Sequence, residues 1–166
     1  IQMRNSGNDF GNTMMRDAFI QSVTMHRMDL DYLAYEPAVI FINGQYYGIE
    51  NLRERSSSDY LYSNYGLDDG DVRIIEATNL GVDTDKDIAT DPEYLELCQF
   101  VKSVDIVSAD GYEQVCKKID VDEFINYMNA QIYIGNTDWP YNNVKMWKVK
   151  GIDKWRWIYF DTDFGF

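Results

Sequence analysis

Residues 136–166 read NTDWPYNNVKMWKVKGIDKWRWIYFDTDFGF, and this stretch decides the fold. Residues 144–150 and 155–160 are rich in β-branched and aromatic residues, a composition typical of strands. Gly151 lies between them, so the pattern predicts a β-hairpin. Such a hairpin would bring the polar loop before its first strand next to the carboxylates that follow its second strand.

Four polar residues of these two loops form the candidate site: Asp138, Asn143, Asp161 and Asp163. The hairpin is expected to gather their three carboxylates and one amide in one place. Mg²⁺ prefers oxygen ligands and is often held by one or two carboxylates together with substrate phosphates. Gathered carboxylates also repel one another, so we expect the pKa of at least one of them to be raised. The alternative is that Asp138 and Asn143 cap turns while Asp161 and Asp163 end a strand.

The order of these residues adds information. Asp138 and Asn143 have the D-x-x-x-x-N spacing, and Asp163-Phe164-Gly165 follows across the hairpin. Protein kinases place a catalytic loop and a metal-binding loop in the same order. The His-Arg pair of a kinase catalytic loop is missing, and no G-x-G-x-x-G phosphate loop is present.

The rest of the chain predicts a mixture of strands and helices. Asn43-Gly44 favours a tight turn between strands at 37–42 and 45–52. Further short strands are expected at 1–5 and 72–76. Helices are expected from residue 12 or 13 to about 28, and at 58–65, 92–101, 110–118 and 120–135. The predicted fold class is therefore α+β, with two β-hairpins and four to five helices.

Caps and apolar spacing refine two of these helices. Asn12 or Thr13 is expected to cap the first helix, and Asp120 with Glu123 resembles a capping box at the start of the last. Three- and four-residue spacing predicts a buried side for each: Met15, Ala18, Phe19 and Val23 in the first, and Phe124, Met128, Ile132 and Tyr133 in the last.

The composition restricts the class of partner. The chain has 166 residues, and 15 Lys and Arg against 28 Asp and Glu give it a net charge of −13. A surface this acidic repels phosphate backbones and anionic lipid headgroups, so nucleic acid is not an expected partner. No apolar run approaches the length of a spanning helix, so membrane insertion is not expected either. Metal ions and basic partners are favoured. The oligomeric state is not predicted.

Five stretches resemble the spore-coat protein H (CotH) kinase-like family: residues 3–9 (MRNSGND), 15–19 (MRDAF), 41–48 (FINGQYYG), 136–143 (NTDWPYNN) and 157–166 (WIYFDTDFGF). The resemblance spans essentially the whole chain. It implies a divergent protein-kinase-like fold in one domain over 1–166, with N-lobe-like strands and a helix in 1–55 and a helical part with the catalytic and metal loops in 56–166. The abrupt ends suggest a fragment that is incomplete at both ends. A spore-coat, exported or cell-surface location is suggested by the same resemblance.

The resemblance also implies an activity and roles for residues. The family uses ATP and a divalent metal, Mg²⁺ or Mn²⁺, to phosphorylate Ser or Thr of partner proteins. Asp138 would match the catalytic aspartate. Asp163, Asp161 and Asn143 would match the metal ligands. In place of a kinase strand lysine, Arg4 is the candidate cation for nucleotide phosphates, with Asp17 as its partner.

Two other classes of function remain open on the sequence. A kinase-like scaffold could persist as a surface or adhesion module that binds without turnover. A metal-dependent glycosyltransferase could use Asp161-Thr162-Asp163 as its D-x-D motif, although Asn143 and Phe164-Gly165 would then have no role.

Three further signals favour ordinary structural roles. Asp83, Asp85, Asp87 and Asp91 resemble the start of a calcium loop, but Ile88 and Tyr94 stand where glycine and glutamate belong. His26 has no second ligand at metal-binding spacing. Cys98 and Cys116 are expected to be buried thiols, with a disulfide as the alternative.

Overall fold

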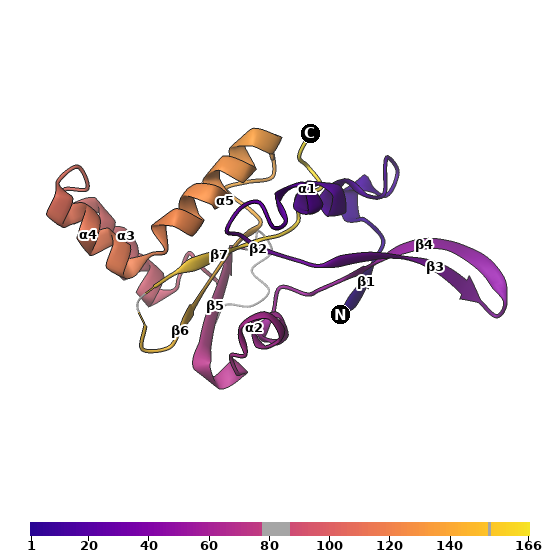
Figure 1. Cartoon of the computed structure of the whole chain (residues 1–166), viewed down its shortest axis with the longest axis horizontal. Coiled ribbons are helices and arrows are strands. Elements are labelled where there is room, and N and C mark those ends of the chain that lie inside the picture. The colour runs from indigo at the N-terminus through magenta and orange to yellow at the C-terminus, as the bar shows by residue number, and fades with distance from the viewer. Residues whose placement is uncertain (78–86, 153) are drawn as a thin grey trace.

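The computed structural model describes residues 1–77, 87–152 and 154–166, and it is an α+β structure (Figure 1). The α-helices are α1 (Arg16–Thr24), α2 (Ser58–Tyr65), α3 (Pro92–Ser103), α4 (Ala109–Lys118) and α5 (Val121–Ile134). The strands are β1 (Gln2–Arg4), β2 (Asp31–Tyr32), β3 (Tyr35–Ile42), β4 (Gln45–Arg53), β5 (Val72–Ala77), β6 (Val144–Val149) and β7 (Arg156–Tyr159). Two short 3₁₀ helices, Gly7–Asp9 and Asp69–Asp71, complete the described elements.

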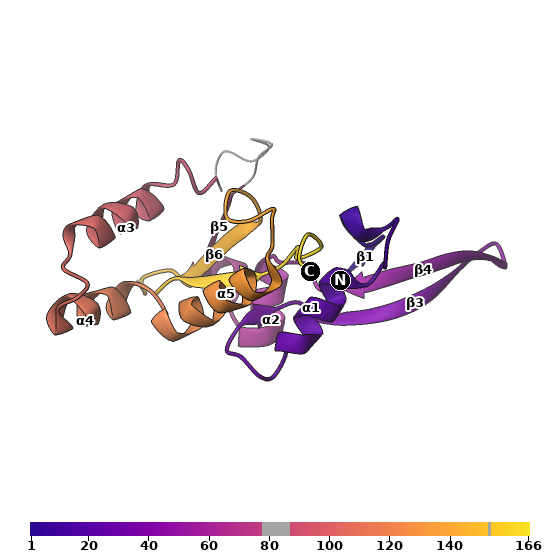
Figure 2. The same cartoon turned by 90° about the horizontal axis from the view of Figure 1, so that it is seen from above.

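The first sheet has the strand order β1-β4-β3, with both pairings antiparallel. The predicted turn is confirmed, since Asn43 and Gly44 have φ angles of 52° and 79° and connect β3 to β4. The β3–β4 hairpin projects away from the rest of the molecule (Figure 2). The short strand expected at the start of the chain is β1, which pairs with the base of β4 and so sits close to the body of the protein.

The second sheet has the order β2-β7-β6-β5. The predicted hairpin of residues 144–160 forms its centre, with Met146 opposite Trp157. The predicted strand at 72–76 joins the outer side of β6, and the two-residue strand β2, which the sequence did not predict, lies parallel to β7. This sheet therefore places the start of β6 and the end of β7 at the same edge.

Two hydrophobic clusters cover the two faces of the β6–β7 hairpin. Met146, Trp157 and Tyr159 belong to the cluster that includes Tyr127 and Ile134 of α5. Trp147, Ile158 and Phe160 belong to the other cluster, which includes Leu61 of α2. Successive strand residues point to opposite faces, so this alternation buries the hairpin between α5 and α2.

Helix α1 differs from its prediction in its start, its end and its buried side. It ends at Thr24, whereas the sequence predicted an end near residue 28. It begins at Arg16, and its free N–H groups are bonded by Asp9, whose carboxylate accepts from Met15 N at 3.1 Å and Arg16 N at 3.0 Å. The predicted cap Thr13 instead donates its own N–H to Asp9. A buried carboxylate upstream therefore replaces the local cap.

The predicted apolar side of α1 is wrong for three of its four residues. Met15, Phe19 and Val23 are 55%, 49% and 38% exposed, and only Ala18 is buried. The buried side consists of Asp17, Ala18, Ile20, Gln21 and Thr24. Asp17 bonds the loop that follows β7, as described below, while Gln21 donates to Asp17 and accepts from Leu33 N.

Helix α5 has the predicted bounds but not the predicted cap. Asp120 makes no side-chain bond to the helix, and Glu123 turns inward, where its Oε2 accepts from Trp157 N at 3.1 Å. Ile132 and Tyr133 are 65% and 78% exposed, so half of the predicted buried side is wrong. The inward face instead follows Glu123, Tyr127, Ala130, Gln131 and Ile134.

The remaining predictions about helices are confirmed. Gly66 ends α2 with a φ of 69°, and Asp91 caps α3 by accepting from Tyr94 N at 2.9 Å. Cys98 and Cys116 are free thiols, as expected, but they are half-buried rather than buried. In the acidic loop, Asp83 and Asp85 lie outside the described residues, while Asp87 and Asp91 bond local backbone N–H groups.

Candidate active site

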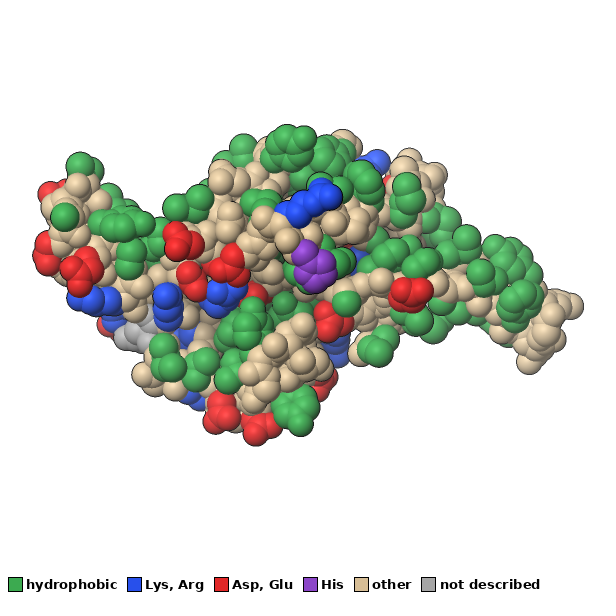
Figure 3. Space-filling model, viewed as in Figure 1, with side chains coloured by type: hydrophobic (Ala, Val, Ile, Leu, Met, Phe, Trp, Pro, Cys, Tyr) green, Lys and Arg blue, Asp and Glu red, His purple; other side chains and the backbone are tan. Residues whose placement is uncertain are grey.

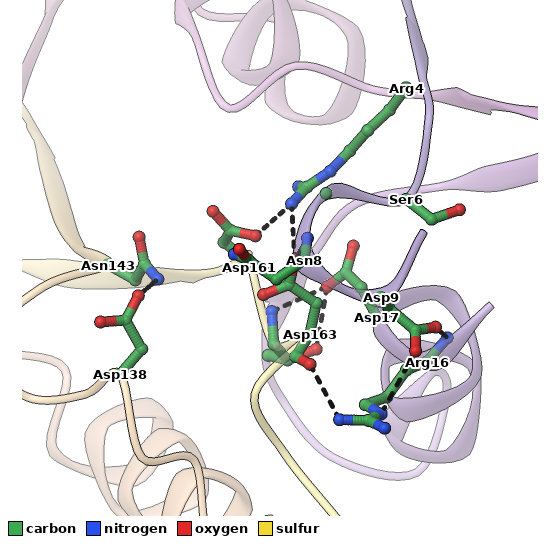
Figure 4. Close-up of polar contacts among 12 residues, drawn as sticks. Arg4, Ser6, Asn8, Asp9, Arg16, Asp17, Asp138, Asn143, Asp161 and Asp163 are labelled. Carbon is green, nitrogen blue, oxygen red and sulfur yellow. Dashed lines mark hydrogen bonds and ion pairs between the residues drawn. The ribbon is translucent and has the colours of Figure 1, made fainter. Parts of the chain in front are cut away.

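The first loop of the site follows α5, which ends at Gly135 with a φ of 61°. One oxygen of Asp138, Oδ2, accepts from Asn142 Nδ2 at 2.9 Å and from Asn143 Nδ2 at 2.8 Å. Because the Asn143 amide nitrogen faces Asp138, its carbonyl oxygen faces away (Figure 4). No hydrogen bond to Asp138 Oδ1 occurs among the described residues.

The second loop follows β7 and carries Asp161, Thr162 and Asp163. Arg4, on β1, forms an ion pair with Asp161 and lies 3.4 Å from Asp163 Oδ2. Asp163 is only 2% exposed, and its Oδ2 also accepts from Asn8 N at 2.9 Å. Its other oxygen, Oδ1, is buried and has no hydrogen-bond partner in the described part of the chain. A buried carboxylate oxygen without a donor is uncommon and needs a partner of some kind.

Gly7 allows the closest approach of the chain to Asp163. It has a φ of 56°, and a Cβ at this position would lie 2.4 Å from Asp163 Oδ2 and 2.7 Å from Arg4 Nη2. Any side chain would therefore collide with the carboxylate and the guanidinium, besides adopting a disfavoured backbone conformation.

Residues of α1 hold the same loop from its other side. Arg16 Nη1 donates to the backbone oxygen of Asp163 at 3.2 Å, and Asp17 Oδ1 accepts from Thr162 N at 2.9 Å and Thr162 Oγ1 at 2.8 Å. The segment from Arg4 to Asp17 thus contacts each of the three loop residues. About 150 residues of the sequence separate this segment from the loop.

Burial affects the two aspartates of this region in opposite ways. Burial and the neighbouring Asp161 raise the pKa of Asp163, and the Asn8 N–H and Arg4 offset this only in part. The expected rise in one carboxylate pKa therefore has the predicted direction, with burial as its first cause. Burial also favours a raised pKa for Asp17, but Arg53 and the bonds from Thr162 and Gln21 bring that pKa below its ordinary value.

The expected single cluster of three carboxylates and one amide is wrong. Asp138 bonds Asn143, and Asp161 and Asp163 contact Arg4, but no contact joins the two pairs (Figure 4). Among the described residues, no three His, Cys, Asp or Glu side chains are placed to hold a metal together. Each pair has its own local partners: the amide N–H groups of Asn142 and Asn143 bond Asp138, whereas the Arg4 guanidinium lies between Asp161 and Asp163.

The expected pairing of Arg4 with Asp17 is also wrong. Asp17 Oδ2 lies 2.9 Å from Arg53 Nη2, while Arg4 turns to the loop carboxylates. The sequence missed Gly7, Asn8, Arg16, Arg53 and Thr162. Only Gly7 carried a local signal, as a glycine in a polar turn; the others contact the loop through the tertiary fold alone.

A matching family model covers the whole chain, residues 1–166, and is described as CotH kinase protein. The chain therefore belongs to the CotH kinase family, as the resemblance of its motifs indicated. A comparison with curated proteins found no match to this chain. In the parts of the chain that the structure describes, no helix is both long and apolar enough to cross a membrane.

Proposed function

We propose that this domain transfers the γ-phosphoryl group of ATP to Ser or Thr hydroxyls of partner proteins, with Mg²⁺ or Mn²⁺ as cofactor. The observation that carries the proposal is the pair of loops at one edge of the second sheet. One presents a carboxylate with a free oxygen, Asp138, and the other presents a buried carboxylate oxygen without a donor, Asp163 Oδ1. Membership of the CotH kinase family supports the same class of reaction.

The oxygen atoms that these residues offer are of the kind that bind a divalent metal. Asp163 Oδ1 is a buried anionic oxygen that lacks a partner among the described residues. Asp161 stands two residues away, and both carboxylates lie beside Arg4. Two carboxylates suffice for Mg²⁺ when nucleotide phosphates and waters complete its shell. When bound, the metal would neutralise charge on the phosphates as the phosphoryl group moves.

Asp138 would act on the acceptor hydroxyl. The amides of Asn142 and Asn143 hold its Oδ2, so the carboxylate cannot rotate freely and Oδ1 keeps a constant direction. That oxygen can accept a hydrogen bond from a Ser or Thr hydroxyl and orient its oxygen for attack.

Arg4 would act on the nucleotide. Its side chain is 23% exposed and already bridges two carboxylates, so it can also meet an anionic phosphate at the edge of the site. A planar guanidinium binds phosphate oxygens in pairs, which suits this position.

The decisive experiment measures phosphate incorporation from labelled ATP into a partner protein, with Mg²⁺ or Mn²⁺ present. Asp138→Ala and Asp163→Ala should each abolish incorporation. Asp68→Ala, which changes an exposed aspartate on the loop after α2, should retain it. Incorporation that is absent in the unmodified protein, or unaffected by both site variants, would refute the proposal.

Metal binding can be tested separately from turnover. We expect millimolar Mg²⁺ or Mn²⁺ to raise the melting temperature at about pH 7, because the ion binds the folded state and relieves the repulsion around Asp163. The rise should be smaller at about pH 4, where protons compete for a carboxylate whose pKa is raised. Asp163→Asn should reduce the rise, whereas Asp68→Asn should preserve it. Equal responses of these two variants would indicate a nonspecific effect of the −13 charge.

The second candidate, a binding module without turnover, is favoured by one observation. The projecting β3–β4 hairpin carries large exposed apolar side chains (Figure 3), including Val39, Phe41, Tyr46 and Tyr47, each at least 59% exposed. Exposed apolar patches often mark interaction surfaces. Partner binding that persists in Asp138→Ala, with no incorporation in any variant, would favour this function.

A further inference from the structure

We propose that Asp17 is a positioning residue for the loop of Asp161, Thr162 and Asp163. Through Thr162 it sets the direction of the two neighbouring carboxylates and touches neither nucleotide nor metal. The inference rests on the proposed function, because the direction of these carboxylates matters if they hold a metal. It assigns Asp17 a different role from the expected one, which was to partner Arg4 at the nucleotide.

Asp17 holds Thr162 at two points with one oxygen. The backbone N–H and the hydroxyl of Thr162 both donate to Asp17 Oδ1, at 2.9 Å and 2.8 Å. Thr162 is completely buried, so no water competes for these bonds. Bonding the main chain and the side chain of one residue to the same acceptor restricts both its backbone and its rotamer.

The neighbouring Asp161 needs such support. It has a φ of 51°, in the left-handed region that non-glycine residues rarely adopt and that surrounding contacts must maintain. With Thr162 turned toward α1, the side chains of Asp161 and Asp163 both reach the guanidinium of Arg4. The bond to Asp17 thus separates an anchoring residue, Thr162, from the two carboxylates that face Arg4.

Asp17 has little capacity left to bind a ligand itself. Its Oδ1 also accepts from Gln21 Nε2 at 2.9 Å, and its Oδ2 lies 2.9 Å from Arg53 Nη2. Asp17 and Arg53 are 7% and 3% exposed. The charge is therefore neutralised inside the protein, which is the usual condition for a buried carboxylate. Outer residues that orient metal ligands in this way commonly change metal affinity tenfold or more when removed.

Thr162→Val is the informative variant. Asp17→Ala would leave the buried Arg53 without an ion partner and is expected to unfold the protein. Thr162→Val keeps the shape of the side chain and the Asp17–Arg53 pair but removes the hydroxyl donor. Thr162→Ser restores that donor. Thr24→Val is the matched control, because it removes a buried hydroxyl of α1 that donates to Gln21 O at 2.9 Å and lies outside the loop.

The first readout is Mn²⁺ affinity by calorimetry in the presence of ADP. We expect Thr162→Val to weaken it about tenfold, and Thr162→Ser and Thr24→Val to retain the affinity of the unmodified protein. The second readout is hydrogen exchange of metal-free protein, in which the backbone of residues 161–165 should exchange faster in Thr162→Val than in Thr24→Val.

The outcomes separate the two proposals. If the unmodified protein binds no Mn²⁺ with ADP, the proposed function fails and the positioning role fails with it. If the unmodified protein binds Mn²⁺ and Thr162→Val binds equally well, the positioning role alone is refuted. Equal losses in Thr162→Val and Thr24→Val would also refute it, because the cause would then be general destabilisation.

Discussion

Asp17 and Glu123 are both buried carboxylates that accept a backbone N–H from the last strand or the loop after it, yet they differ in ionisation. Asp17 receives Thr162 N and has Arg53 as its ion partner, and its pKa is lowered. Glu123 receives Trp157 N, but its Oε1 has no partner among the described residues. Burial, reinforced by Asp31, raises the pKa of Glu123 to about 9.

The difference shows that burial alone does not determine the charge of a carboxylate in this protein. A guanidinium in direct contact keeps Asp17 ionised at the candidate site, whereas Glu123, beneath the second sheet, holds a proton at neutral pH. A charged positioning residue and a neutral structural residue can therefore occupy similar environments.

The largest expected effect comes from removing the ion partner of Asp17. Arg53→Met should lower the free energy of unfolding by about 3–5 kcal/mol near neutral pH, because it leaves a buried charge unpaired. Since the pKa of Asp17 is lowered in the folded protein, the stability from this pair is present above the unfolded carboxyl pKa and is lost as pH falls. The deficit should therefore shrink below about pH 4. Urea denaturation as a function of pH measures both effects, and a deficit that is constant with pH would contradict the ion-pair explanation.

Glu123→Gln should have the opposite pH dependence. Above the unfolded pKa of about 4.5 and up to the folded value of about 9, the folded protein binds one more proton at Glu123 than the unfolded chain does. Stability is thus lost as pH rises, by about 1.4 kcal/mol per pH unit for one proton. Glutamine resembles the protonated side chain, so from about pH 6 to 8 the variant should lose about 2–3 kcal/mol less than the unmodified protein. If the free energy of unfolding falls equally with pH in the variant and in the unmodified protein, Glu123 is ionised in the folded state.

Gly7→Ala tests how rigidly the site around Asp163 is held. The added Cβ would lie 2.4 Å from Asp163 Oδ2, and φ is positive, so we expect a loss of about 1–3 kcal/mol and weaker Mn²⁺ binding. Gly44→Ala is the matched control, since Gly44 has a φ of 79° but no atom within 4 Å of the added Cβ. It should cost about 1 kcal/mol, from the backbone alone, and leave Mn²⁺ binding unchanged. If the two variants have equal effects on thermal unfolding and Mn²⁺ binding, the chain around Gly7 and Asp163 shifts at little cost to accommodate the added Cβ.

Arg4→Met is expected to have the smallest effect on stability. Arg4 and Asp161 are both partly exposed to solvent, and the buried Asp163 keeps its bond from Asn8 N, so the loss of Arg4 should cost about 1 kcal/mol or less. Because Arg4 opposes the raised pKa of Asp163, the variant should raise that pKa further and lose stability at neutral pH rather than at low pH. NMR titration of the Asp163 carboxyl measures this directly. A loss as large as that of Arg53→Met would mean that both ion pairs are equally buried in solution.

Local chemistry made much of the secondary structure predictable. Asn43-Gly44 supplied the turn of β3 and β4, Gly66 ended α2, and Asp91 with Pro92 began α3, because each depends on the backbone preferences of adjacent residues. The β6–β7 hairpin was predictable for the same reason, and with it the position of Asp138 and Asp163 at loop ends.

The sequence by itself determined the helices and all the strands except β2, the family to which the chain belongs and which loops carry the polar residues of the site. Only the tertiary structure decided how those residues pair. Asp9 caps a helix seven residues away, Arg4 bridges Asp161 and Asp163, and Asp17 bonds Thr162 across 145 positions. Such contacts depend on which elements pack together and on which charges must be neutralised when buried. The spacing of residues along the chain predicts neither.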